Sequence, residues 1–216
     1  MFRSMDQRIC GEGQIIGLPG AGLSGAPPWA VNADAARIGQ AGELRTAEIL
    51  DAAAHRQGVT VLHDLRIPIP GITANVDHVV VSGRRVLLVD AKVWRPGVYW
   101  TVGGRTFRGL HRFAPAEKKT MQMAARAFRT FLQKRGLRGD IVWPLVVVWP
   151  SRAGTFHRAL LRVPGARVIP AGQLTRVIAR FAGRRPADRR VVDALSALVA
   201  AQGTHGRSHH HHSRAA

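Results

Sequence analysis

The sequence predicts an α/β protein in which helices alternate with strands. The first observation is a pair of runs rich in Val, Ile and Leu within residues 72–93, on either side of the polar stretch Ser82-Gly83-Arg84-Arg85. Such a pair is typical of a β-hairpin. The second observation is that segments with apolar residues at helical spacing come before and after this hairpin. The chain has 216 residues, of which 46% are hydrophobic, so it suits one domain with a sizeable core.

Before the hairpin we expect one helix and one strand. Residues 1–31 are rich in glycine, proline and small side chains without sustained periodicity, which predicts a disordered lead. The periodic segment 34–55 predicts a helix, and Gly58 follows it as a stop signal. Residues 59–69 predict a strand that is ended by prolines.

After the hairpin, apolar periodicity and glycine or proline signals predict further strands and helices. These elements are a second hairpin at 98–107, a helix at 116–135, a strand at 141–149, a short strand at 166–169, and helices at 171–182 and 188–202. The domain should therefore span residues 32–202. Residues 203–216, which contain the run SHHHHSRAA, predict a disordered tail or a tag remnant.

Three charged residues interrupt the apolar hairpin: Asp77, Asp90 and Lys92. If the turn consists of two residues, counting back from it places Asp77 directly opposite Asp90, so both carboxylates share one face. Asp90 and Lys92 are two apart on one strand and also point the same way. Lys92 balances only one carboxylate, whereas a divalent cation such as Mg2+ would balance both. The alternative is a solvent-facing side on which Lys92 screens two hydrated acids.

The helix at 34–55 carries a third acid, Glu43, on the side expected to face the core. The stripe consists of Ala36, Glu43, Ala47, Leu50 and Ala54. A buried unpaired carboxylate is costly, so Glu43 needs a cation, a hydrogen-bond donor or a metal. The alternative is that Glu43 lies at the solvent edge and pairs with Arg37 or Arg45. Gly39 and Gly42 would let the helix approach a strand or a phosphate closely.

Basic residues outnumber acidic residues by 32 to 13, which gives a formal net charge of +19. This excess indicates a polyanionic partner, with nucleic acid first and an anionic membrane surface second. The helix at 116–135 carries a cationic strip, bordered by Gln122, that could follow a phosphate backbone. The strip consists of Lys118, Lys119, Arg126 and Arg129. The aromatic residues of the hairpin at 98–107 could stack on bases or pack onto the core.

Several classes of protein are excluded by what the sequence lacks. Cys10 is the single cysteine, which excludes an internal disulfide and a multi-cysteine zinc site. The first ten residues lack the apolar segment of a signal peptide. The longest strongly apolar run, residues 145–149, is too short to cross a bilayer. We therefore expect a soluble, cytoplasmic protein with no membrane partner.

Taken together, these motifs resemble the nuclease-related domain family, NERD. This family is a branch of the restriction-endonuclease-like PD-(D/E)xK nucleases. Over roughly residues 35–135, the resemblance rests on Gly39-Gln-Ala-Gly42-Glu43, Asn75-Val-Asp77-His78, Val89-Asp90-Ala91-Lys92 and Gln122. Asp90 stands where many superfamily members carry Glu, which shortens the reach to a metal without removing a ligand. The residues before Gln122 also depart from the family's Asn-Pro pattern.

The resemblance implies a restriction-endonuclease-like core, which is a mixed β-sheet flanked by helices in the order αβββαβ, here with C-terminal helices added. It also implies a hydrolase of phosphodiester bonds that acts on DNA and needs Mg2+ or Mn2+. In that scheme Asp77, Asp90 and the carbonyl of Ala91 hold the metal, and Glu43 completes its shell. Lys92 orients the water or stabilises developing negative charge.

Gln122 would position water or the nucleic-acid backbone in the same scheme. All the expected polar positions are filled in this chain, which favours an active enzyme. Two other classes of protein stay open at this point. One is a nucleic-acid-binding module that keeps the fold without cleaving. The other is a basic adaptor for acidic proteins or membrane, in which the carboxylates are structural.

Overall fold

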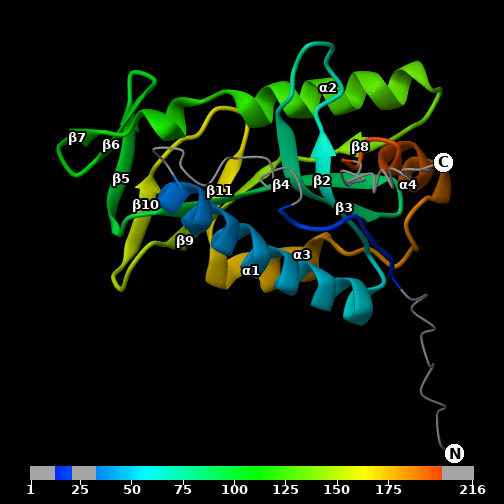
Figure 1. Ribbon diagram of the computed structural model, residues 1–216, viewed down its shortest axis with the longest axis horizontal. Coiled ribbons are helices and arrows are strands. Elements are labelled where there is room, and N and C mark those ends of the chain that lie inside the picture. The colour runs from blue at the N-terminus through cyan, green and yellow to red at the C-terminus, as the bar shows by residue number, and fades with distance from the viewer. Residues whose placement is uncertain (1–12, 21–32, 201–216) are drawn as a thin grey trace, which may run out of the picture.

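The computed structural model describes residues 13–20 and 33–200, and Figure 1 shows a sheet held between helices. The core elements follow the αβββαβ order. They are α1 (Ala33–Gln57), β2 (Thr60–Arg66), β3 (Asn75–Ser82), β4 (Arg85–Trp94), α2 (Thr120–Lys134) and β9 (Leu145–Pro150). The helices α3 (Leu174–Phe181) and α4 (Arg189–Ser196) come after this core. The predicted fold class is therefore confirmed.

The main sheet is mixed and has the strand order β1-β2-β3-β4-β9-β11. Its short members are β1 (Ile15–Ile16), β11 (Arg167–Pro170) and β8 (Asp140–Ile141), which pairs with β4. β3 is antiparallel to both β2 and β4, because short connections join these strands. β9 is parallel to β4, because the chain crosses over through α2 before it returns to the sheet.

Helices cover both faces of this sheet. Alternate residues of the central hairpin point to opposite faces: Val79 and Val81 belong to the cluster that includes α2 and α4, and Val80 belongs to the cluster that includes α1 and α3. Figure 1 shows α2 on one side of the sheet and α1 with α3 on the other. Because both faces are buried, the hairpin strands read as almost continuous apolar runs.

The central hairpin has the register that the sequence predicts. Ser82 pairs with Arg85 across the two-residue turn, and Gly83 at its first position has a φ of +56°. Glycine takes this left-handed conformation without steric cost. The paired ladder runs from there to His78 and Val89, so the next opposed pair is Asp77 and Asp90.

A second, four-stranded sheet lies at one end of the molecule, with the order β10-β5-β6-β7 (Figure 1). Its strands are β5 (Gly97–Val102), β6 (Arg105–Arg108), β7 (His111–Arg112) and β10 (Phe156–Leu160). The predicted hairpin at 98–107 is confirmed as β5 and β6. Tyr99 is buried against Trp94 and Phe113, and Trp100 stacks on Phe107 with 4.7 Å between ring centroids. Tyr99 therefore packs in the core, whereas Trp100 and Phe107 form a half-buried stacked pair.

Three sequence predictions need correction. Within the expected lead, Ile15 and Ile16 form β1, and two paired residues are too few to produce a periodic pattern. The strand expected at 141–149 is broken into β8 and β9, because Pro144 cannot donate to a ladder. α4 ends at Ser196, and the chain after it pairs with β2, where the Arg66 N–H donates to the Leu198 carbonyl.

Two short 3-10 helices, η2 (Ala114–Glu117) and η3 (Ala171–Gln173), lead into α2 and α3 and account for the early start predicted for both. The rest of the lead and the tail at 203–216 lie outside the described residues. Within the described part of the chain, none of the helices is long and apolar enough to cross a membrane.

Candidate active site

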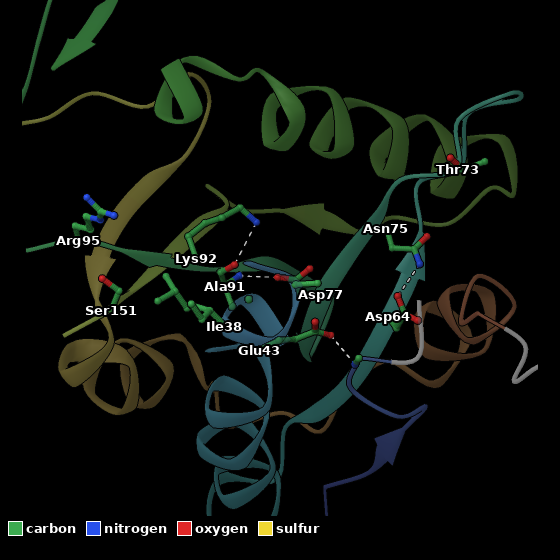
Figure 2. Close-up of a pocket in the computed structure, with 14 residues that line it drawn as sticks. Ile38, Glu43, Asp64, Thr73, Asn75, Asp77, Ala91, Lys92, Arg95 and Ser151 are labelled. Atoms are coloured by element: carbon green, nitrogen blue, oxygen red, sulfur yellow. Dashed lines mark hydrogen bonds between the residues drawn. The ribbon is translucent and has the colours of Figure 1, made fainter. Parts of the chain in front are cut away.

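Two of the three predicted acids, Glu43 of α1 and Asp77 of β3, line one cavity of about 800 Å³, whereas Asp90 of β4 does not line it and contacts Lys92. Ala91 and Lys92 of β4 also line it, and Figure 2 shows Lys92 on the side of β4 away from α1, with Glu43 on the α1 side. The cavity forms where β3 and β4 stop pairing, just beyond the His78 and Val89 pair.

Asp77 marks the point at which the two strands separate. One of its carboxylate oxygens, Oδ2, accepts a hydrogen bond from the Ala91 N–H at 2.7 Å. This contact satisfies a backbone donor of β4 that the ladder with β3 leaves free. It also holds the partly buried carboxylate of Asp77 at the level of Asp90.

Lys92 forms an ion pair with Asp90 at 2.7 Å and also donates to the Ala91 carbonyl at 3.1 Å. The side chain of Asp90 is 13% exposed, whereas that of Lys92 is 46% exposed. The alternative of two hydrated surface acids screened by Lys92 is therefore wrong for Asp90, which is largely withdrawn from solvent.

The site holds more negative charge than Lys92 can compensate. Burial and the neighbouring charges of Asp90 and Glu43 together raise the pKa of Asp77 to about 8, against the opposing effects of Lys92 and the Ala91 N–H. Burial alone would lower the pKa of Lys92, but the Asp90 and Asp77 carboxylates outweigh that effect and raise it. Lys92 is therefore a cation at neutral pH, and the carboxylates around it repel one another.

Glu43 faces inward, as its position on the helical stripe predicts. Its side chain is buried, and its Oε1 accepts a hydrogen bond from the Gly20 N–H at 2.6 Å. Burial raises the pKa of Glu43, while the Gly20 hydrogen bond lowers it and the charge of Asp64 raises it. The solvent-edge alternative is wrong, and Arg45 instead lies 5.7 Å from the ring centroid of Trp149.

The position of Glu43 depends on how closely α1 approaches the sheet. A Cβ placed on Gly42 would lie 2.5 Å from Cγ2 of Val93, so α1 touches β4 at this residue. A chain of hydrogen bonds ties α1 to β9 at the same point: Trp149 Nε1 donates to Thr46 Oγ1, which donates to the Gly42 carbonyl, each at 2.8 Å. Of the two predicted glycines, Gly42 makes the close contact, whereas a Cβ placed on Gly39 would meet nothing within 4 Å.

Asp64, which sequence reasoning missed, and Asn75, which it quoted in a motif without giving it a role, also line this cavity (Figure 2). Asp64 is 4% exposed and accepts a hydrogen bond from Asn75 Nδ2 at 2.6 Å. The sequence signal that could have identified Asp64 is an acid inside the apolar run of β2. The pairing register of β2 with β3, which brings Asp64 to this cavity, could not be predicted from the sequence, because no two-residue turn joins these strands.

Gln122 and the basic residues of α2 lie elsewhere. Gln122 lines a second cavity, of about 670 Å³, together with Lys119 and Arg126 on α2, and it does not line the cavity that holds Asp77. Arg129 is exposed on the same helix, and Lys118 is exposed just before its first turn. The cationic strip therefore exists as a surface, but it is separate from the acidic cavity.

The described residues contain no group of three or more His, Cys, Asp or Glu side chains close enough together to hold a metal ion. The oxygens available to a cation are thus paired carboxylates supplemented by a backbone carbonyl. Hard oxygen donors of this kind suit Mg2+ or Mn2+, which commonly bind through one or two carboxylates and keep several waters.

Comparison with known proteins supports the same assignment. No curated protein and no solved structure matches the chain. The family model of the nuclease-related domain matches residues 38–149, which is just over half of the chain and contains Glu43, Asp77, Asp90 and Lys92. The chain therefore belongs to the nuclease-related domain family.

Proposed function

We propose that this protein is a metal-dependent phosphodiester hydrolase that acts on DNA. The observation that carries the proposal is the juxtaposition of Asp77 and Asp90 at the end of the β3–β4 ladder, beside the Lys92 ammonium and the inward-facing Glu43. At least two carboxylates face one ammonium in a cavity open to ligands.

A divalent cation fits this donor set. Burial and the neighbouring acids disfavour the ionised form of Asp77, and a divalent cation would stabilise that form. Asp77, Asp90 and the Ala91 carbonyl would hold the ion, and Glu43 would contact it directly or through water. When bound there, the cation supplies polarisation of the scissile phosphate and a bound water of lowered pKa.

Lys92 acts as a donor and not as a base, because its raised pKa keeps it protonated at neutral pH. Its ammonium can donate to the attacking water or to a phosphate oxygen that gains negative charge. The side chain is 46% exposed, so it can turn from Asp90 towards a bound phosphate without disturbing the core.

The basic surface offers binding contacts to a polyanion even though the cavity itself is acidic. The net charge of +19 draws nucleic acid to the protein, and Lys119 and Arg126 offer phosphate contacts on α2. Lys118 and Arg129 extend this strip. We propose that Gln122, beside Lys119 and Arg126, contacts the nucleic-acid backbone. The preference for DNA over RNA rests on the family alone.

The proposal is tested by plasmid cleavage with Mg2+, comparing the unaltered protein with Asp90→Ala and Lys92→Ala. Removing either group should reduce cleavage by at least about 100-fold, which is the usual effect of losing a charge-stabilising group. Omission of the metal should have the same effect. Cleavage that persists in both variants would remove the enzymatic assignment.

A non-catalytic nucleic-acid-binding module is the second candidate. One observation favours it: Lys92 already contacts Asp90 and the Ala91 carbonyl, so an internal ion pair occupies two of the proposed metal ligands. DNA binding that weakens steeply between low and moderate salt, without any metal-dependent cleavage, would support this candidate.

A further inference from the structure

We propose that Asp64 and Asn75 provide a second divalent-cation position in the same cavity, next to the one at Asp77 and Asp90. This inference rests on the proposed function, because it assumes that the cavity takes divalent cations. It adds two ligands whose side chains have no role in the scheme that the family resemblance implies.

The first step is the position of Asp64 in the sheet. His63 pairs with His78 and Leu65 pairs with Val76, so Asp64 stands opposite Asp77 on the neighbouring strand. Since Asp77 in turn stands opposite Asp90, three adjacent strands carry an aspartate at one level. Figure 2 shows Asp64 and Asn75 at one end of the cavity, with Asp77 between them and Lys92.

The second step is that Asp64 is buried with one oxygen unpartnered. Its Oδ1 accepts from Asn75 Nδ2 at 2.6 Å, while its Oδ2 has no hydrogen-bond partner in the described part of the chain. The Oδ1 of Asn75 is also buried and unpartnered there. Leaving a buried acceptor unpaired costs about 1–3 kcal/mol, and more for a charged group. Each of these two acceptors therefore calls for a donor or a cation.

The third step identifies a cation as the partner. Lys92, the ammonium of this cavity, is already bound to Asp90 and the Ala91 carbonyl. An incoming phosphate would be repelled by Asp64 and could not donate to it. A carboxylate and an amide carbonyl are both hard oxygen ligands, which is the chemistry that Mg2+ prefers. Glu43 lines the same cavity as Asp64 and Asn75 and offers a further carboxylate there.

The backbone of Asp64 provides well-matched test variants. This residue has a φ of +55° within β2, a left-handed conformation that asparagine and glycine tolerate better than other residues. Asp64→Asn keeps an acceptor for Asn75 and removes the charge. Asp64→Gly removes the whole side chain and fits the left-handed backbone. Asp193→Asn, on the exposed side of α4, removes one negative charge at a distance and serves as the control.

The experiment is calorimetric titration of the full chain and these variants with Mg2+ at pH 8. The four adjacent histidines near the C-terminus are present in every variant, and Mg2+ prefers oxygen to imidazole ligands. Two binding events are expected in the unaltered protein and in Asp193→Asn. One event should disappear in Asp64→Asn and Asp64→Gly, and the other should disappear in Asp90→Asn.

Circular dichroism and thermal melting, with and without Mg2+, provide the second readout. The Asp64 variants should stay folded and should gain less in melting temperature from Mg2+ than the control does. Unchanged stoichiometry in both Asp64 variants would overturn this inference and leave the proposed function intact. If the Asp64 variants and Asp90→Asn lose the same binding event, the two positions are not separate and the inference is overturned. No Mg2+ binding by the unaltered protein would remove both.

Discussion

Replacing Gly42 by alanine tests whether the contact between α1 and β4 sets the position of Glu43. The added methyl would lie 2.5 Å from Cγ2 of Val93, and 3.5 Å from Cδ1 of Trp149. Valine is stiff about χ1, so it cannot turn away easily, and α1 must move away from the sheet. Glu43 is the next residue along the helix and would move with it.

The expected change in the free energy of unfolding combines two effects. Alanine favours a helix over glycine by about 1 kcal/mol. Overpacking of a close contact costs about 1–3 kcal/mol, so Gly42→Ala should be destabilising by up to about 2 kcal/mol. In a domain of this size that corresponds to a fall of several degrees in melting temperature. Cleavage should fall by about 10-fold or more, because a shift of about 1 Å in a reacting group can cost 100-fold.

Gly39→Ala is the matched control, since it makes the same substitution in the same helix where nothing lies within 4 Å of the new methyl. Gly39→Ala should benefit from the higher helix propensity of alanine without any overpacking, so its free energy of unfolding should rise by up to about 1 kcal/mol. Urea unfolding of the metal-free proteins measures both free energies, and plasmid cleavage is measured for Gly42→Ala. If Gly42→Ala is as stable as Gly39→Ala, the proposed contact does not position the helix.

The remaining predictions concern the charged and buried groups. The pKa of Asp77 is raised to about 8, so the protonated carboxyl contributes stability to the fold that is fully present below about pH 4 and is lost as the pH rises through 8. In metal-free buffer, Asp77→Asn should therefore narrow the difference in melting temperature between pH 5 and pH 9. Burial lowers the pKa of His78 to about 3, so the free energy of unfolding should fall as the pH drops from 6.5 towards 3. The urea midpoint should fall less over this range in His78→Gln, whereas the exposed His55→Gln is the control and should fall as the unaltered protein does. Lys92→Met should bind Mg2+ more tightly by calorimetry while losing cleavage, because the ammonium shares Asp90 and the Ala91 carbonyl with the cation; weaker Mg2+ binding would refute that competition.

Features set by neighbouring residues could be predicted from the sequence alone. The two-residue turn at Gly83 determines the register of β3 and β4, and that register brings Asp77 level with Asp90. The helical repeat of α1 likewise predicts that Glu43 points inward, since residues on one stripe share one environment. In both cases the geometry follows from a local repeat and needs no knowledge of distant residues.

Features that depend on distant segments could not be predicted in this way. Asp64 meets the site only through the register of β2 against β3, and the eight residues between these strands are too many for that register to be counted from a two-residue turn. The hydrogen bond from Gly20 to Glu43 joins residues 23 apart, across a segment whose pattern indicates no structure. The helical pattern of α2 shows which residues are basic but not which cavity they line, so it did not reveal that Gln122 lies apart from the acids. The sequence by itself therefore determined the strands and the pair of aspartates between them, whereas the tertiary structure alone decided which further side chains share their cavity, because the packing of separate elements sets those distances.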